Sequence, residues 1–360
     1  MRVWRRVIKV VNVPKRFISL FIVGISLSMA IAACNFEANI IAKPSQNVEF
    51  TLASFIVTRN AYKAIIPKFT QKWQQEHNQT VRINQSYSPS GAQTRAVIDG
   101  LPADVVHLAM ALDTSKIEQT GLIAPGWEKR LPNNSIVSQS VVALVTRKDN
   151  SQSINSWSDL AKDNLRLITA DPKTSGVARW NFLALWNAAI NSKGNEAKAA
   201  DYVTKVYGNA PILSRDAREA TDAFLKLGQG DVLINYEHEI ILAQQKGLQA
   251  NYVIPDVNIS IDNPIAIVDK NVDRHGNREV VEAFVQFLFT PEAQAEFAKV
   301  GFRPVVDISA QTQELKQLAG KYPPVESLNQ VSNFGGWNQV QTKFFADGAM
   351  FDQIQTKINR

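Results

Sequence analysis

Cysteine is almost absent from this chain of 360 residues: Cys34 is the single one, so an internal disulfide is impossible. The four histidines show no HExxH motif and no His/Cys spacing typical of a zinc site. The turns contain neither a GxxxxGK(S/T) nor a GxGxxG phosphate-binding loop. These absences remove the usual signatures of disulfide scaffolds, zinc enzymes and nucleotide-binding domains, and we expect no cofactor and no metal.

The sequence also lacks a visible pair of nucleophile and base, which most covalent enzymes require. His238 lies between Glu237 and Glu239, a setting that suits a metal ligand or an acid–base group. We favour the alternative of a histidine that is packed or lies at the rim of a cleft. The sequence therefore predicts a protein that is not an enzyme.

Residues 1–33 have the pattern of a signal peptide. Six Lys and Arg residues occur among them, and Phe17 to Ala33 is an apolar stretch without charge that ends in small residues. Ile31 to Cys34 is similar to a bacterial lipobox, in which the cysteine is lipidated. Two alternatives stay open, a lipid anchor at Cys34 or ordinary cleavage that leaves an idle thiol. In both, residues 34–46 form a polar tether and the protein is expected in the periplasm.

The net charge of the chain comes entirely from this leader. The whole chain has 39 Lys and Arg against 33 Asp and Glu, and six basic residues but no acidic one precede Cys34. The remainder is therefore neutral overall, so we expect no binding to nucleic acid. Its length suggests two domains.

Apolar strands alternate with helices through most of the chain, which favours parallel sheets covered on both faces and hence an α/β fold. A helix is expected from Thr58 to about Trp73, bent at Pro67. A boundary is expected near residues 147–151. The clearest predicted strands are residues 48–55, 81–86, 104–109, 136–145, 165–168, 210–213, 231–236 and 265–268.

Four of the predicted helices begin directly after strands, at Thr58, Ser90, Ser175 and Asp216. In an open α/β sheet such helix starts gather at the carboxyl edge, where ligands bind. Their unpaired N–H groups and the positive end of the helix dipole favour an anion. Ser175 has two interpretations: it caps its helix, or its hydroxyl serves an anion site together with the amides that follow.

Several stretches, in the same order, resemble bacterial sulfate-binding proteins, the solute receptors of sulfate/thiosulfate ABC transporters. The resemblance runs from about Val48 to the C-terminus. It is carried by SYSPSGAQ at Ser86–Gln93, ADVVHLAMALD at Ala103–Asp113, DPKTSGVARWN at Asp171–Asn181, RDAREATDAF at Arg215–Phe224, GDVLINYE at Gly230–Glu237 and FGGW at Phe334–Trp337.

The resemblance implies a type II periplasmic binding protein, with two α/β domains around an anion-binding cleft. Its first domain is discontinuous and comprises residues 47–145 and 258–360, and its second comprises residues 146–257. The implied function is an exported receptor that binds sulfate or thiosulfate, works as a monomer and delivers its anion to a membrane permease. The alternatives are a receptor for molybdate or phosphate, and a secreted hydrolase of sulfate or phosphate esters.

In this family sulfate is held without a counter-cation, mostly by backbone N–H groups. The chain departs from the family at Tyr236, where a tryptophan N–H is usual, and at Ile56, where an aspartate is usual. Tyr236 therefore has the alternative interpretation of a wall residue. The ligand-binding residues implied by the resemblance are the amides of Ile56, Ser90, Gly176, Val177 and Ala217, the hydroxyl of Ser175 and the side chain of Tyr236.

Sulfate is a full dianion at neutral pH and only accepts hydrogen bonds, so a ring of donors suits it. Hydrogen phosphate also donates and needs an acceptor, which Asp171 or Asp216 would supply. We favour instead that Asp171 completes a turn and that Asp216 caps a helix. Arg179 and Arg218, each just inside a helix start, are expected to support the loops from behind.

Overall fold

The computed structural model describes residues 47–192, 194–308 and 311–358. The predicted signal peptide at 1–33, the lipobox cysteine Cys34 and the tether at 34–46 lie outside these residues. None of the helices within the described ranges is long and apolar enough to cross a membrane.

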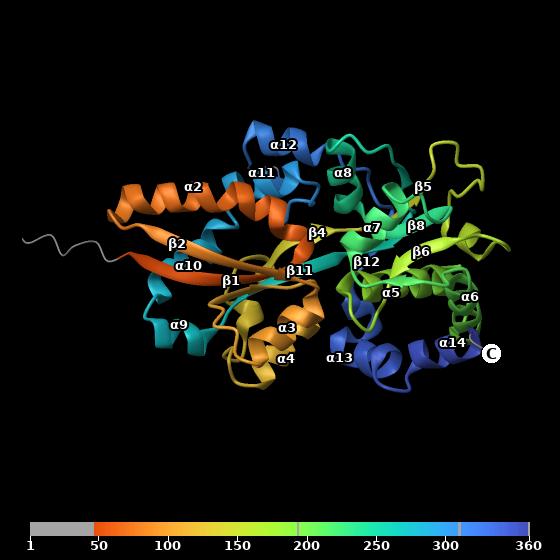
Figure 1. The fold of residues 1–360 in the computed structure, drawn as a ribbon, viewed down its shortest axis with the longest axis horizontal. Helices are drawn as coiled ribbons and strands as arrows, with labels where there is room; N and C mark the ends of the chain where they lie inside the picture. The colour runs from red at the N-terminus through yellow and green to blue at the C-terminus, as the bar shows by residue number, and fades with distance from the viewer. Residues whose placement is uncertain (1–46, 193, 309–310, 359–360) are drawn as a thin grey trace, which may run out of the picture. The chain divides into compact units, whose positions relative to one another are not determined.

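Two five-stranded sheets organise the described chain (Figure 1). The first has the order β2-β1-β3-β11-β4; β1, β2 and β3 are parallel, and β11 runs antiparallel to both β3 and β4. This mixed sheet with helices on both faces confirms the α/β class. Its strands are β1 (Val48–Phe55), β2 (Val81–Ser88), β3 (Val105–His107), β4 (Ile136–Ser140) and β11 (Ile261–Ile267).

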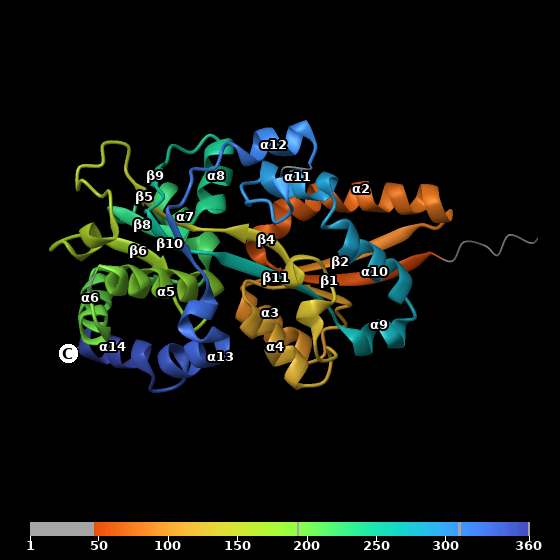
Figure 2. The same ribbon diagram turned by 180° about the vertical axis from the view of Figure 1, so that it is seen from behind.

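Alternate residues of the first sheet face different helices. Phe50 packs on Phe284 of α10, whereas Ala53 belongs to a cluster with residues of α3 and α4 on the other face. Figures 1 and 2 both show α2 along one face and α3 and α4 along the opposite one. We call this sheet and its helices the first lobe. The helices are α2 (Arg59–His77), α3 (Ser90–Ile98), α4 (Ala111–Gln119), α9 (Asp269–His275), α10 (Arg278–Phe287), α11 (Pro291–Lys299) and α12 (Gln313–Ala319).

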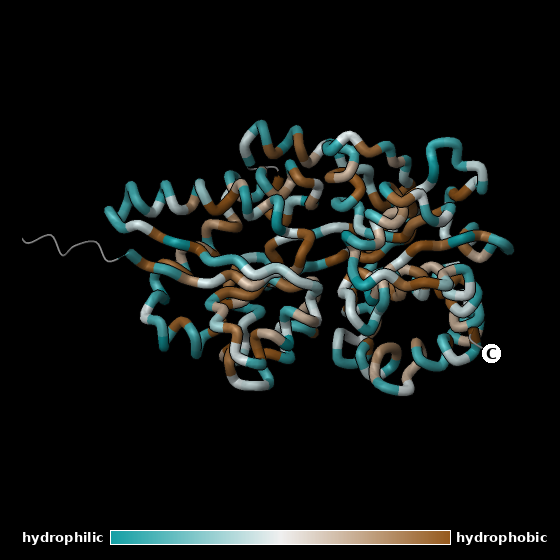
Figure 3. The backbone as a smooth tube through the Cα atoms, in the orientation of Figure 1, coloured by the Kyte–Doolittle hydropathy of each residue, from teal (hydrophilic) through white to brown (hydrophobic). Residues whose placement is uncertain are grey.

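The second sheet has the order β7-β6-β8-β5-β9, with β6 parallel to both β7 and β8 and with β5 antiparallel to β8. Hydrophobic residues gather along the strands of both sheets, as Figure 3 shows. Every residue of β5 and of β8 is buried, as expected for strands covered on both faces. The strands are β5 (Val142–Thr146), β6 (Leu167–Ala170), β7 (Leu213–Ser214), β8 (Val232–Tyr236) and β9 (Asn251–Val253).

Helices α5 and α6 cover one face of the second sheet, and α7 and α8 cover the other. The last helices of the chain join α5 and α6: Trp337 packs edge-on against Trp180 with ring centroids 4.6 Å apart, and Phe351 lies against Tyr207. We call this sheet and its helices the second lobe. They are α5 (Gly176–Asn191), α6 (Glu196–Gly208), α7 (Ala217–Leu225), α8 (Glu237–Gln245), α13 (Gly336–Val340) and α14 (Met350–Ile358).

The chain passes between the lobes at Val141, where one predicted strand becomes two. Residues 136–145 were expected to form a single strand, but β4 pairs in the first sheet and β5 in the second. The prediction was wrong because residues 136–145 contain neither glycine nor proline to mark the change of sheet. A small parallel pair between the lobes, β10 (Val257–Ile259) with β12 (Ser327–Asn329), accompanies two further passages. The predicted domain boundaries stay a prediction.

The first helix also differs from expectation. Thr58 does not cap it but ends a short 3-10 turn, Ile56–Thr58, and its hydroxyl donates to the Phe55 carbonyl at 2.8 Å. Helix α2 then continues past Pro67 to His77 rather than ending near Trp73. Phe69, in the turn after Pro67, packs on Phe284 and Phe287 of α10, and such packing outweighs the one hydrogen bond that proline removes.

Candidate functional site

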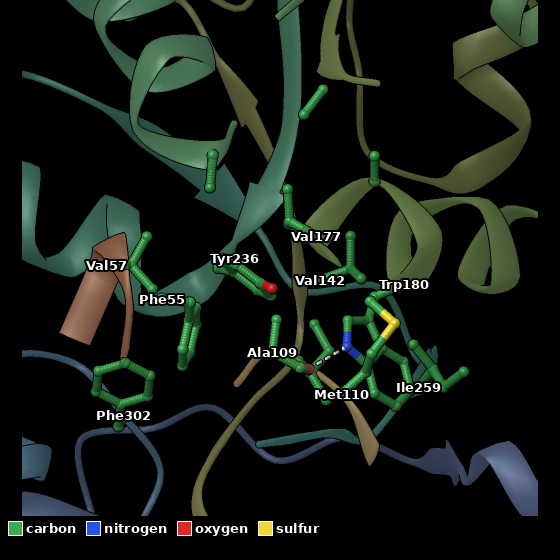
Figure 4. Packing of buried hydrophobic residues seen from close by; sticks show 14 of the residues in the cluster. Phe55, Val57, Ala109, Met110, Val142, Val177, Trp180, Tyr236, Ile259 and Phe302 are labelled. Atoms are coloured by element: carbon green, nitrogen blue, oxygen red, sulfur yellow. Dashed lines mark hydrogen bonds between the residues drawn. The ribbon is translucent and has the colours of Figure 1, made fainter. Parts of the chain in front are cut away.

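All seven residues implied by the resemblance line one small pocket between the lobes. The first lobe contributes Ile56 and Ser90, and the second contributes Ser175, Gly176, Val177, Ala217 and Tyr236. Phe55, Val57, Pro89, Ala109 and Asp216 complete the lining. Figure 4 shows Tyr236 among Val177, Ala109 and Phe55.

Four helical segments begin at this pocket. The 3-10 turn begins at Ile56, α3 at Ser90, α5 at Gly176 and α7 at Ala217. The first amides of a helix have no carbonyl of their own turn to bind, so they remain available as donors. A fifth start, that of α8 directly after Tyr236, was not counted from sequence among the helix starts of the site, although a helix was expected after this strand. The strand passes into this helix without a turn residue.

Ser175 occupies the N-cap position of α5 but does not act as a cap. Its backbone is extended (φ −115°, ψ 131°), and its side chain makes no capping hydrogen bond. The turn before it is held instead by Asp171, whose carbonyl accepts the Ser175 N–H at 2.8 Å and whose Oδ1 accepts the Lys173 N–H at 2.8 Å. The turn role expected for Asp171 is confirmed, and the Ser175 hydroxyl is not needed to start the helix.

Asp216 caps α7 as expected. Its Oδ1 accepts the Glu219 N–H at 2.9 Å, and the Arg215 guanidinium lies 3.5 Å from its Oδ2. The carboxylate is thus occupied by the helix that it starts, although it lines the pocket.

Asp113 fixes the Ser90 turn and was not singled out from the sequence. The Ser90 hydroxyl donates to Asp113 Oδ2 at 2.7 Å and accepts the Ala109 N–H at 3.0 Å. Asp113 is buried in α4 and forms an ion pair with Lys116 at 3.7 Å. Because its hydroxyl is engaged, Ser90 offers only its backbone N–H to the pocket. The aspartate that ends the ADVVHLAMALD stretch was the available signal.

Tyr236 brings a buried hydroxyl to the same pocket. Its side chain is 1 % exposed, and its Oη has no hydrogen-bond partner among the described residues. Burial raises the pKa of Tyr236 well above 10, so the hydroxyl stays protonated and remains a donor. A buried donor without a partner costs roughly 1–3 kcal/mol, which a ligand acceptor at this position would recover.

His238 is packed, as favoured from sequence. Its ring stacks between Tyr236 and Phe302, with centroids 4.7 Å and 4.0 Å away. Burial lowers the pKa of His238 well below 6.5, so the ring is neutral. No group of three or more His, Cys, Asp or Glu residues within the described ranges is placed to hold a metal ion.

The two arginines near the helix starts lie behind the pocket rather than in it. Arg179 donates from Nε to the Pro172 carbonyl at 2.8 Å. Arg218 forms two hydrogen bonds with Glu239, both of 2.7 Å. Neither guanidinium belongs to the pocket lining, so their expected supporting role agrees with the structure.

Solved structures define the class of this fold. The sulfate-binding protein SubI from Mycobacterium tuberculosis H37Rv is 31 % identical and superposes with a TM-score of 0.74, covering 83 % of this chain and 100 % of that one. A periplasmic thiamin binding protein shares the fold at 16 % identity, with a TM-score of 0.65 over 87 % of this chain and 97 % of that one. The architecture is therefore that of a periplasmic binding protein.

Sequence relatives give the family. Residues 50–303 match the family described as bacterial extracellular solute-binding protein. A sulfate-binding protein of Synechococcus elongatus is 54 % identical, over 87 % of this chain and 88 % of its own length. A thiosulfate-binding protein of Pseudomonas aeruginosa is 35 % identical, over 87 % of this chain and 92 % of its own length. The chain therefore belongs to the bacterial extracellular solute-binding proteins and, within them, to the sulfate-binding protein family, which confirms the resemblance found in the sequence.

Proposed function

We propose that this protein is an exported receptor that binds sulfate in the pocket between its lobes and delivers it to the permease of an ABC transporter. One observation carries the proposal. The unpartnered Tyr236 hydroxyl lies in the same pocket as the first residues of four helical segments. These groups are all hydrogen-bond donors, and a ligand that only accepts suits them.

The acceptors around the pocket support sulfate over hydrogen phosphate. The carboxylates of Asp171 and Asp216 are committed to a turn and a helix cap. Of these two, only Asp216 lines the pocket, and its Oδ1 already accepts a backbone N–H. A bound hydrogen phosphate would therefore meet few acceptors for its P–O–H, and a donor left unsatisfied costs roughly 1–3 kcal/mol. Sulfate carries no such proton.

Thiosulfate and molybdate remain the competing ligands within the same class. Both are dianions without a proton at neutral pH, so the donor argument does not separate them from sulfate. Relatives of this chain include proteins named for sulfate and others named for thiosulfate. We propose sulfate as the main ligand because the more similar relatives carry that name.

The remaining parts of the proposal concern the protein's setting. Residues 1–33 direct export, Cys34 carries a lipid or lies near the cleavage site, and the receptor works as a monomer in the periplasm. The donor-rich pocket supports binding rather than hydrolysis, since the described lining offers no histidine and a single carboxylate, which already caps a helix.

Calorimetric titration with sulfate, thiosulfate, molybdate and hydrogen phosphate tests this function. We expect one-to-one binding with sulfate preferred and with hydrogen phosphate much the weakest. Preferred binding of hydrogen phosphate would overturn the choice of ligand. Turnover of a chromogenic sulfate or phosphate ester, abolished by Ser175→Ala, would overturn the receptor in favour of a hydrolase.

A further inference from the structure

The Ala109 carbonyl receives two side-chain hydrogen bonds, one from each lobe. Trp180, on α5 of the second lobe, donates from Nε1 at 2.9 Å, as the dashed line in Figure 4 shows. Asn263, on β11 of the first lobe, donates from Nδ2 at 3.0 Å. All of these groups are buried, with Trp180 and Asn263 both fully inaccessible to solvent.

Ala109 is also part of the pocket. It contributes to the lining, and its N–H donates to the Ser90 hydroxyl that positions the start of α3. One turn before Trp180, Gly176 lies so close to Ala109 that an added Cβ would stand 2.5 Å from the Ala109 Cβ. The first turn of α5 therefore contacts Ala109, which belongs to the first lobe and also lines the pocket.

The lining residues Ser90, Ser175 and Tyr236 are all buried, so an anion enters this pocket when the lobes separate. Separation moves the Gly176 turn and Trp180 away from Ala109, and the Trp180–Ala109 hydrogen bond breaks. The Ala109 carbonyl keeps its bond to Asn263, so opening does not leave it without a partner. The tryptophan N–H gains water in exchange, and such an exchange is reversible at low net cost.

We propose that Trp180 is a positioning residue for anion binding: its hydrogen bond to Ala109 holds the α5 start against the first lobe and stabilises the closed state. The proposal rests on the proposed function, because closure is here closure on a bound anion. Trp180 itself does not line the pocket. Trp180 therefore affects the rate at which the anion dissociates, and it does not itself contact the anion.

Trp180→Phe tests the proposal, with Trp186→Phe as its matched control. Trp186 lies on the same helix and is equally buried, but it packs on Phe182 and Phe344 within the second lobe. We expect Trp180→Phe to weaken sulfate binding about 2- to 10-fold, mostly through faster dissociation measured by stopped flow. Trp186→Phe should bind and release sulfate as the parent does.

Unchanged dissociation from Trp180→Phe would overturn the proposal, as would an equal acceleration in both variants. Should the phenylalanine variant misfold, a benzothienylalanine at position 180 keeps the shape and removes only the N–H, and the same rates decide. If the parent binds no oxyanion, the proposed function fails, and small-angle scattering of the anion-free proteins tests the positioning role alone. A larger radius of gyration for Trp180→Phe than for Trp186→Phe supports it, and equal radii overturn it.

Discussion

Gly176 and Ala109 belong to different lobes and meet at the pocket wall. A Cβ built on Gly176 would lie 2.5 Å from the Ala109 Cβ and 2.9 Å from the Met110 Cε, closer than real Cβ atoms approach other atoms. Glycine is therefore required here for its small size, since its φ is not in the left-handed region. The close contact exists only while the lobes are together.

Gly176→Ala should hinder closure. Overpacking of this kind costs roughly 1–3 kcal/mol, which corresponds to about 5- to 150-fold weaker sulfate binding. The melting temperature without anion should change little, because an open protein accommodates the methyl group. Gly91→Ala is the control, since its nearest neighbour lies at an ordinary 3.6 Å. Equal affinities for the two variants would show that the lobes do not need this contact.

Tyr236→Phe should weaken sulfate binding by roughly 1.5–3 kcal/mol, or about 10- to 150-fold, because it removes one hydrogen bond to a charged ligand. Tyr207→Phe is a matched control: the Tyr207 hydroxyl is also buried without a partner among the described residues, but it lies on α6 away from the pocket. Calorimetry of both variants gives the comparison. If Tyr236→Phe binds like the parent, the tyrosine is only a wall residue.

Ser175→Ala should lower the affinity for sulfate by a similar amount and leave the melting temperature of the anion-free protein nearly unchanged. A capping serine would instead cost about 1 kcal/mol of stability on replacement, but Ser175 makes no capping bond. Thr290→Ala serves as the contrast, since the Thr290 side chain does cap α11, accepting the Ala293 N–H at 3.3 Å. A clear loss of stability in Ser175→Ala would restore its role as a cap.

Stability should fall on acidification. His107 is buried, with its ring nitrogens near Tyr62 Oη at 2.8 Å and Ser138 Oγ at 3.2 Å, and burial lowers its pKa from 6.5 to about 3. Below pH 6.5 His107 is protonated in the unfolded chain, whereas in the folded chain it stays neutral down to about pH 3. The free energy of unfolding is therefore unaffected by His107 above pH 6.5 and falls by about 1.4 kcal/mol per pH unit below it.

Denaturant titration at pH 7 and pH 5 measures this effect, and we expect about 2 kcal/mol less stability at pH 5 from His107 alone. His107→Gln should have a flatter profile. Sulfate affinity, in contrast, should stay constant from about pH 6 to 8, since the buried histidines are neutral throughout and sulfate does not titrate there. A tenfold change in affinity across that range would point to a protonated ligand.

The proposed export predicts that the mature protein begins at or near Cys34. Mass spectrometry of the native N-terminus decides between the two alternatives, a lipid on Cys34 or ordinary cleavage. With a lipid present, Cys34→Ala should release the receptor from the membrane fraction. A bare N-terminus well away from Cys34 would reject the lipoprotein and leave the binding site unaffected.

Local signals in the sequence explain why part of the site was predictable. Ser90, Ser175 and Asp216 each follow a predicted strand, and the helix begins within a residue of each. Such signals depend on a few neighbouring residues, so they can be read without knowledge of the tertiary contacts. The residues without a turn signal, Ile56 and Tyr236, came from the family resemblance alone.

The features that sequence reasoning missed are long-range. At Val141 the chain passes from one sheet to the other, and neither glycine nor proline marks the change. Thr58 has the residue type of a cap, but burial against Ser54 decides its role. The contact of Trp180 with Ala109 joins residues 71 positions apart, a separation at which periodicity carries no information.

The described lining of the pocket contains no lysine or arginine. Backbone dipoles act over a much shorter range than a full charge. A site built from them therefore binds an anion through direct contacts and attracts a distant anion only weakly. Dissolved salt screens distant charges far more than it screens groups sealed inside a protein. We therefore expect a receptor of this design to keep its affinity for the anion when the ionic strength of the medium changes.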